Sequence, residues 1–237
     1  MSGRPLVLGH RGAPKVATEN TIAAFARARE LGADGVELDV RRSADGVLTL
    51  NHDPDVEGVG AIARLTLAEL RAGRPDVATL AEAFETCRGL VTNVEVKCLP
   101  WEPDADRDGS VMRATVDAVV SYLASPNAGA VIVSSFDLGA VDLAHEYAPG
   151  VTTGWLTHGQ EVAGAAVTAA AHGHAWLNPD VTSALAGGRD AIDRAHAAGL
   201  RVSVWTVDDP DDARALAAAG ADCIISNVPD AVIAALG

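Results

Sequence analysis

The chain contains little cysteine. Its 237 residues include three cysteines, Cys87, Cys98 and Cys223, which are scattered, odd in number and in no CxxC arrangement. This usage argues against a disulfide framework and is typical of reduced thiols in a cytoplasmic protein. We therefore expect all three to be small core residues rather than metal ligands or nucleophiles.

Positive charge is scarce as well. The 18 lysine and arginine residues stand against 32 aspartate and glutamate residues, which gives a formal net charge of -14. Such a balance repels nucleic acid and anionic membranes, so we expect neither as a partner. An anionic small molecule would need a local group of cations, which His10, Arg11, Lys97 and a bound metal could supply.

The sequence also has no long apolar segment. Its first residues, Met-Ser-Gly-Arg-Pro, lead into a short apolar run without the hydrophobic region of a signal peptide, and no uncharged stretch reaches transmembrane length. A glycine-rich P-loop and a GxSxG motif are missing too, which argues against nucleoside triphosphate chemistry and serine hydrolysis. We expect a cytoplasmic protein with no stable membrane anchor, whose oligomeric state the sequence leaves open.

What the chain does have is a repeated alternation of short Val/Ile/Leu runs with Ala-rich amphipathic segments. The runs predict eight strands, at 5–9, 35–40, 91–96, 130–134, 151–156, 174–178, 201–206 and 222–226. The segments predict helices, among them 21–31, 79–88, 188–198 and 211–219. This order, with no low-complexity linker, is typical of a (β/α)8 TIM barrel, here a single catalytic domain over 1–237. A plain open α/β sheet is the alternative.

A ninth apolar run, 47–51, does not fit this alternation. It follows the second strand through Ser43-Ala44-Asp45-Gly46, and Asp-Gly is a strong hairpin signal. Because a tight hairpin makes its arms antiparallel, the run predicts a β-hairpin excursion that folds back beyond strand two. It would deliver His52 to the barrel mouth, and residues 54–78 would follow as a short irregular cap.

Carboxylates interrupt the second and third predicted strands. Alternation places Glu37 and Asp39 on one face of a strand, and Glu95 and Lys97 share a face in the same way on the next. Buried carboxylates are costly unless they are paired or bound to a metal, and three oxygen ligands suit Mg2+ or Ca2+ better than zinc. We therefore predict a metal site of Glu37, Asp39 and Glu95. The alternative is a set of structural ion pairs, for which the basic candidates are Arg11, Arg41 and Lys97.

Two histidines, His10 and His52, are expected beside this site. Two imidazoles that flank a reacting group can act as general acid and general base near neutral pH. Arg11 and Lys97 offer donors for a phosphate, and the ring of Trp205 is expected to line the site. A metal, two imidazoles and two cations together predict phosphoryl transfer or hydrolysis.

Two further features have no function that the sequence identifies. Asp104-x-Asp106-x-Asp108-Gly109 resembles the start of an EF-hand loop, but Thr115 stands where the bidentate acid belongs, so we expect a solvated loop. Five histidines have no partner identifiable from the sequence and are expected on the surface or in loops. They are His145, His158, His172, His174 and His196.

Taken together, the chain resembles the glycerophosphodiester phosphodiesterases, a metal-dependent family on a TIM-barrel scaffold. The matching motifs are His10-Arg11-Gly12, Glu19-Asn20-Thr21, Gly32-Ala33-Asp34-Gly35-Val36-Glu37-Leu38-Asp39-Val40, Asp45-Gly46, His52-Asp53, Asn93-Val94-Glu95-Val96-Lys97, Ser134-Ser135-Phe136, Trp205-Thr206-Val207 and Ile224-Ile225-Ser226-Asn227-Val228-Pro229. They run nearly from end to end, and their order and spacing would be very improbable by chance.

The resemblance implies hydrolysis of glycerophosphodiesters to glycerol 3-phosphate and an alcohol, within lipid and glycerol metabolism. The roles that it implies are the divalent metal for Glu37, Asp39 and Glu95, the acid/base pair for His10 and His52, and phosphate contact for Arg11 with Lys97 beside it. The family route that it suggests uses the 2-hydroxyl of glycerol as nucleophile and passes through a cyclic phosphate, which water then opens.

The sequence departs from the family pattern in three places. The Arg-Thr-Thr stretch usual after His-Asp is missing from 55–64, Asp208 replaces the Asn after Trp-Thr-Val, and Ser226-Asn227 replaces a Thr-Asp. We expect none of these to touch the metal ligands or the two histidines, so they bear on the leaving alcohol rather than on the reaction. The alternatives are a lysophospholipase D activity on lysolipids and a non-catalytic barrel that binds phosphorylated ligands.

Overall fold

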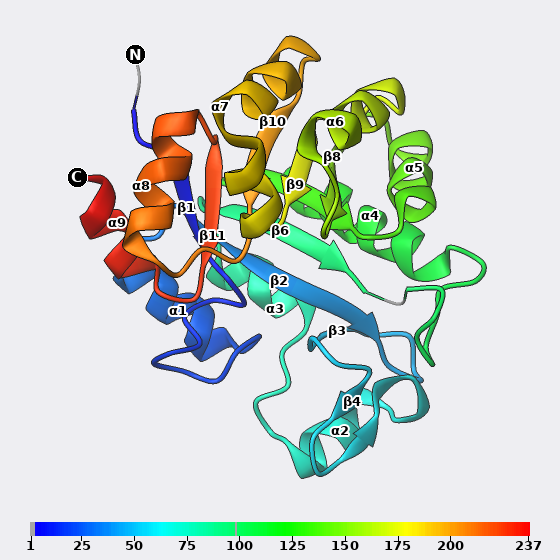
Figure 1. Cartoon of the computed structure of the whole chain (residues 1–237). Helices are drawn as coiled ribbons and strands as arrows, with labels where there is room; N and C mark the ends of the chain where they lie inside the picture. The colour runs from blue at the N-terminus through cyan, green and yellow to red at the C-terminus, as the bar shows by residue number, and fades with distance from the viewer. Residues whose placement is uncertain (1–2, 98) are drawn as a thin grey trace.

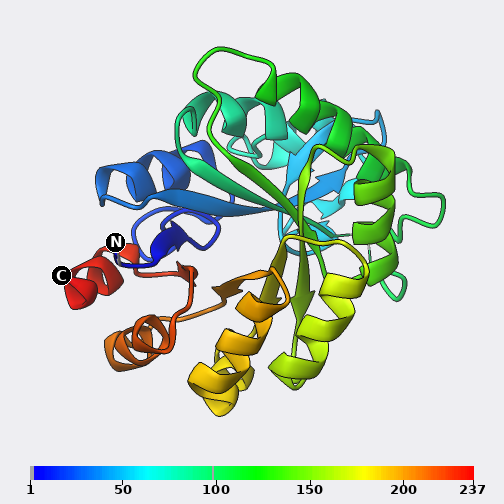
Figure 2. The same ribbon diagram turned by 90° about the horizontal axis from the view of Figure 1, so that it is seen from above.

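Eight parallel strands form a closed barrel in the computed structural model, which describes residues 3–97 and 99–237 (Figures 1 and 2). The strands are β1 (Leu6–Gly9), β2 (Gly35–Arg42), β6 (Val91–Val96), β7 (Val131–Ser135), β8 (Thr152–Thr157), β9 (Trp176–Pro179), β10 (Arg201–Val204) and β11 (Cys223–Ser226). Each pairs in parallel with its neighbours, and β1 pairs with both β2 and β11, which closes the sheet. The predicted (β/α)8 barrel is confirmed, and the open-sheet alternative is wrong.

Helices surround the barrel, as the view in Figure 2 shows. They are α1 (Ile22–Glu30), α3 (Leu80–Thr86), α4 (Ser110–Leu123), α5 (Leu138–Tyr147), α6 (Val162–Ala171), α7 (Val181–Ala197), α8 (Pro210–Ala219) and α9 (Pro229–Leu236). The apolar residues of β2 point outward into the layer between strands and helices, where Val36, Leu38 and Phe25 are fully buried. The opposite face of β2 is thereby left for its charged residues.

One predicted helix is too short. The segment predicted at 188–198 is only the second half of α7, which begins at Val181 because Asp180 caps it by accepting a hydrogen bond from the Ser183 backbone N–H. Gly188, at φ 55° and ψ -156°, interrupts the helix. That break, together with small residues around it, hides the first half from a search for helical periodicity.

The predicted hairpin is confirmed. Strand β3 (Leu48–Leu50) runs antiparallel to β2, with Leu50 opposite Val40 and Leu48 opposite Arg42. The turn closes where the Ser43 N–H donates to the Val47 carbonyl oxygen at 2.9 Å. The chain therefore runs back from the end of β2 to the level of Asp39, whose carbonyl oxygen accepts from the Asn51 N–H at 3.1 Å, just before His52.

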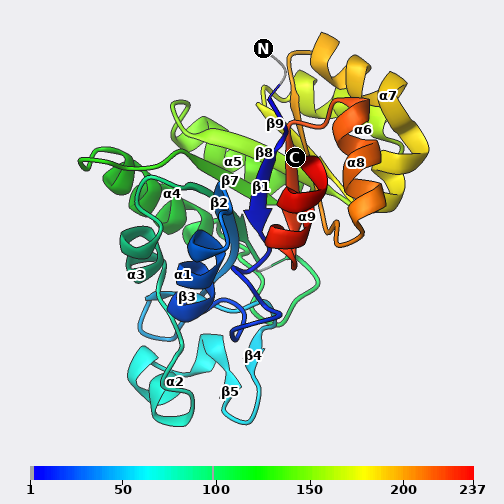
Figure 3. The same cartoon turned by 90° about the vertical axis from the view of Figure 1, so that its left-hand side faces the viewer.

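The cap at 54–78 has more regular structure than predicted. It contains β4 (Asp55–Val56), β5 (Gly60–Ala61), the 3-10 helix η1 (Ile62–Arg64) and α2 (Leu67–Gly73), and it projects from one end of the barrel (Figure 3). Its side chains Val56, Ile62, Leu70 and Val77 form a small apolar cluster of their own. This cluster, and the capping box in which Thr66 and Glu69 satisfy each other's backbone N–H groups, order a segment too short to show periodicity.

Two of the three cysteines are core residues, as predicted. Cys87 and Cys223 are free and buried, and burial raises the pKa of each thiol to about 12. Such thiols are inert at neutral pH. Cys98 lies outside the described residues. Within the described residues, no helix is both long enough and apolar enough to cross a membrane.

Barrel closure depends on the absence of a side chain at Gly35. This residue pairs with Leu8 on one side and Val91 on the other. A Cβ added there would lie 2.1 Å from the Val91 carbonyl oxygen and 2.3 Å from Leu8 Cδ2. Only a residue without a side chain therefore lets three strands meet at this point.

We expect Gly35→Ala to lower the free energy of unfolding by about 1–3 kcal/mol, the usual cost of overpacking. Urea denaturation measures it. Gly150→Ala is the matched control, because a Cβ there would meet no atom within 4 Å. Equal stability of the two variants would contradict the close approach.

Candidate active site

Three carboxylates meet at the carboxyl ends of β2 and β6. Asp39 lies directly opposite Glu95 in the parallel register, and Glu37 lies two pairs earlier, opposite Asn93. One oxygen from each of Glu37, Asp39 and Glu95 lies within 4.8 Å of the others. The exposed fractions of the three residues are 3%, 1% and 7%, so the predicted group is both convergent and buried.

Two basic residues contact this group. Arg11 places Nε 3.1 Å from Asp39 Oδ2, and its backbone N–H donates to Glu37 Oε2 at 2.9 Å. Lys97 Nζ lies 3.2 Å from Asp39 Oδ1 and also contacts Glu95. The ion-pair alternative thus holds for Arg11 and Lys97, yet two cations face three carboxylates and leave one negative charge unbalanced.

Arg41, the third basic candidate, points elsewhere. Its guanidinium pairs with Glu102 and Asp104, each at 2.8 Å, and it is 1% exposed. The prediction that 104–109 is a solvated loop is therefore wrong in part. The Asp104 side chain is 6% exposed beside Arg41, and Asp106 accepts hydrogen bonds from the first turn of α4.

Burial and neighbouring charges give the three carboxyl groups different pKa values. Burial alone would raise the pKa of Asp39, but Lys97 and Arg11 overcome it and lower that pKa to about 2. Burial, with Asp39 adding to it, raises the pKa of Glu37 to about 8, and burial also raises that of Glu95 to about 7. Without a further cation, the group therefore keeps protons near neutral pH that a bound metal would displace.

The donor set fits a hard divalent cation. Among the described residues, the Oε1 atom of Glu37 is buried with no hydrogen-bond partner, although its other oxygen accepts from Arg11. A buried carboxylate oxygen without a donor is costly, and a cation would remove that cost. Three carboxylates without imidazole or thiolate are ligands suited to Mg2+ or Ca2+.

His10, just after β1, is oriented from the other end of the chain. Its Nδ1 lies 2.8 Å from Asn227 Oδ1, while the Asn227 Nδ2 donates to Asp208 at 2.8 Å. Because the carboxylate fixes the amide orientation, His10 donates from Nδ1 and leaves Nε2 unprotonated, 3.9 Å from Glu37 Oε2. Burial and the nearby Arg11 lower the pKa of His10, which favours its neutral form.

This contact overturns one expectation. Two departures from the family pattern, Asp208 and Asn227, bind each other, and Asn227 contacts His10 directly. They were expected to lie away from the two histidines, but they set the tautomer of one of them. The Asn227 amide therefore contacts the His10 imidazole, and the Asp208 carboxylate contacts that amide.

His52 follows the β3 arm and is held through its backbone. Its carbonyl oxygen accepts from Arg41 Nε at 2.9 Å and from Arg41 Nη2 at 2.6 Å. Its ring Nδ1 lies 2.8 Å from Asp53 Oδ1, so Nδ1–H donates and Nε2 remains available. Partial burial and Lys97 lower the pKa of His52, so this imidazole is also mostly neutral at neutral pH.

A cavity of about 400 Å³ opens over the group. It is lined by His10, Arg11, His52, Glu95, Lys97, Leu99, Trp101, Phe136, His158 and Trp205. Trp205 forms part of its wall, as predicted, because its Nε1 donates to the Asn178 carbonyl at 2.9 Å and its ring packs edge-on against Phe136. A larger hollow of about 620 Å³ lies against α6 and α7, and no predicted site residue lines it.

All eight predicted site residues thus lie at one mouth, but several neighbours were missed. Asn20 brackets Asp39: its Nδ2 donates to the Asp39 carboxylate at 2.8 Å, and its Oδ1 accepts from the Asp39 N–H at 3.1 Å. The motif Glu19-Asn20-Thr21 contained this signal without a role attached. Phe136 likewise stood in the motif Ser134-Ser135-Phe136 without a role attached. Leu99 and Trp101 gave no signal, because apolar residues after a strand usually belong to the core.

Comparison with known proteins places these features in a family. The family model described as "Glycerophosphoryl diester phosphodiesterase family" matches residues 10–231. A glycerophosphodiester phosphodiesterase of Caldanaerobacter subterraneus subsp. tengcongensis is 30% identical, with 97% of each chain covered.

The fold is also similar to those of solved structures. The glycerophosphodiester phosphodiesterase of Thermotoga maritima superposes with a TM-score of 0.79 at 27% identity, covering 99% of both chains. A phosphodiesterase of Oleispira antarctica, solved in complex with the product sn-glycerol-3-phosphate, gives a TM-score of 0.81 at 26% identity, covering 98% of this chain and 97% of that one.

Arg41 links the site to the segment after β6, and its loss should destabilise the fold. We expect Arg41→Ala to lower the free energy of unfolding by roughly 3–5 kcal/mol, because removing one member of a buried ion pair leaves charge uncompensated. Urea denaturation is the measurement, and Arg27→Ala, at an exposed pair with Glu30, is the control. Comparable small effects in both variants would show that Arg41 is not structurally important.

Proposed function

The chain belongs to the glycerophosphoryl diester phosphodiesterase family, and from this premise we propose that it hydrolyses glycerophosphodiesters to glycerol 3-phosphate and an alcohol with the help of a divalent metal. The observation that carries the proposal is the buried group Glu37, Asp39 and Glu95 beside two neutral imidazoles at one cavity. A barrel that only binds phosphorylated ligands would not need this acid/base pair.

In the proposed mechanism, Glu37, Asp39 and Glu95 would hold Mg2+ or Ca2+, which would supply positive charge for the phosphoryl oxygens. Arg11 and Lys97 line the same cavity and add donors for the phosphate. Their contacts with Asp39 hold both cations close to the group that the substrate would approach. A protein with a net charge of -14 needs such a local group of positive charges to bind an anion.

His10 and His52 would move the protons. Each donates from Nδ1 to a fixed acceptor, Asn227 or Asp53, which leaves Nε2 for the substrate. One imidazole, in its neutral form, takes the proton from the 2-hydroxyl of glycerol at Nε2 as that oxygen attacks phosphorus. The other, which must first bind a proton at Nε2, gives that proton to the departing alcohol oxygen. Water then opens the cyclic phosphate with the roles reversed. Either histidine can begin as the base.

A lysolipid is the second candidate substrate. The cavity has an apolar rim of Leu99, Phe136 and Trp101, and the Trp101 side chain is 75% exposed. An exposed tryptophan beside a phosphate site would suit an acyl chain. The cap at 54–78 favours a polar substrate instead, because it carries charged residues that include Glu57, Arg64, Glu69, Arg71, Arg74 and Asp76. The rates on glycerophosphocholine and lysophosphatidylcholine decide between the two.

The first test is release of glycerol 3-phosphate from glycerophosphocholine. We expect turnover that disappears after thorough metal stripping and returns with Mg2+ or Ca2+. Undiminished turnover in the stripped protein would exclude the metal role of the three carboxylates.

Glu37→Gln separates the metal site from structure. We expect it to weaken metal affinity measured by calorimetry while the melting temperature changes little, because the metal-free carboxylates repel one another. Equal losses of metal affinity and of melting temperature would instead favour a structural ion-pair role.

The two histidines can be tested one at a time. His10→Ala and His52→Ala should each lower kcat by about 100-fold or more, the size of a lost acid/base step. His196→Ala is the control, because His196 pairs with Asp222 outside the cavity. A variant that keeps a near-normal kcat would remove its histidine from the mechanism.

A further inference from the structure

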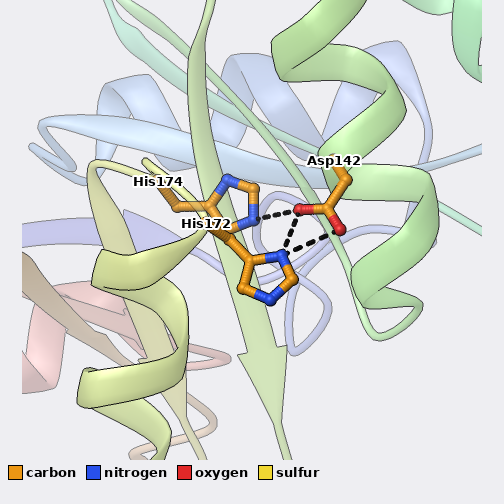
Figure 4. A group of neighbouring side chains, drawn as sticks. All are labelled: Asp142, His172 and His174. Carbon is orange, nitrogen blue, oxygen red and sulfur yellow. Dashed lines mark hydrogen bonds and ion pairs between the residues drawn. The ribbon is translucent and has the colours of Figure 1, made fainter.

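A second group of metal-ligating side chains lies at the opposite end of the barrel. Asp142 comes from α5, and His172 and His174 come from the segment between α6 and β9 (Figure 4). His174 precedes β9 by two residues, so the group sits at the amino ends of the strands. The proposed catalytic site sits at their carboxyl ends, and the two groups share no residue.

The three side chains converge on one point. Nδ1 of His172 lies 2.9 Å from both oxygens of Asp142, and Nε2 of His174 lies 3.1 Å from Oδ1 of Asp142. With Zn–N and Zn–O bonds of about 2.0–2.1 Å, neighbouring ligands of a tetrahedral ion are about 3.3 Å apart. The Asp142–His172 and Asp142–His174 separations therefore need only a small expansion to admit a metal ion, and all three ligand atoms lie within 4.8 Å of one another.

The surroundings of His174 suit a metal ligand. It is 5% exposed, and its Nδ1 lies 3.1 Å from the hydroxyl of Thr153, a contact that fixes the ring. Its buried Nε2 has no hydrogen-bond partner of good geometry among the described residues.

This arrangement corrects the expectation that these histidines lack partners. His174 is buried, and a carboxylate and two further imidazoles surround it: the rings of His145 and His172 each lie 6.1 Å from its own. Asp142, His145 and His172 also line a hollow of about 400 Å³, which leaves room on the open side of the group.

We propose that Asp142, His172 and His174 form a second metal site, selective for Zn2+ or a similar transition metal, whose open position faces the hollow lined by His145. Two imidazoles and one carboxylate suit zinc, whereas the three carboxylates of the catalytic group suit harder cations. The ion ties α5 to the segment before β9. Its role is structural, and it is independent of the proposed hydrolysis.

The test is zinc binding to the metal-stripped full chain in excess Mg2+, which occupies the carboxylate site. We expect calorimetry to find one zinc ion per chain and the melting temperature to rise with zinc. His172→Gln, at a side chain that is 39% exposed, should weaken zinc affinity by at least about 10-fold and abolish the rise in melting temperature.

His196→Gln is the matched control, because this exposed histidine also pairs with an aspartate, Asp222, but belongs to no group of three metal-ligating side chains among the described residues. It should bind zinc like the unaltered chain. Equal zinc affinity in all three proteins, or no zinc binding in excess Mg2+, would leave only an Asp–His ion pair and overturn the proposal.

Crystals grown with Zn2+ give a second, direct readout. Anomalous density at the zinc edge should appear between Asp142, His172 and His174. Anomalous density only at the carboxylate group would refute the site, whatever the activity of the protein toward phosphodiesters.

Discussion

The constraint on which the catalytic end of this barrel depends is the burial of three carboxylates within contact of one another. Barrel interiors are normally filled by branched apolar side chains. Here β2 and β6 instead bring Asp39 opposite Glu95 with Glu37 beside them, and Arg11 and Lys97 place positive charge against them. The residues around the three carboxylates partly offset this excess of negative charge. Asn20 brackets Asp39, the Arg11 backbone donates to Glu37, and the cavity gathers positive charge where an anion would bind.

Much of this arrangement could be predicted because it follows from local periodicity. Alternation along β2 separates Glu37 and Asp39 from Val36 and Leu38, and Asp-Gly between two apolar runs fixes an antiparallel return. Parallel strands then bring their carboxyl ends to one edge. Each of these steps requires only a short window of sequence and a fold class.

What could not be predicted requires contacts between distant positions. His10 and Asn227 are 217 residues apart, and nothing near either residue indicates that one fixes the tautomer of the other. Asp142 and His172 are 30 residues apart on different elements, so their convergence depends on how α5 packs beside the segment before β9. The first half of α7 was missed for a local reason, since Gly188 breaks the period that a sequence search uses.

The pairing of β1 with β11 has a consequence for synthesis. A nascent chain whose last strand is still within the ribosome can order β2 and β6, but β1 then has one unpaired edge and His10 lacks its acceptor. The three carboxylates lie on strands from the first half of the chain, whereas the orientation of the imidazole beside them depends on Asn227, which directly follows the last strand. Loss of the final segment would therefore leave His10 without this acceptor while the sequence of the acidic strands stays complete.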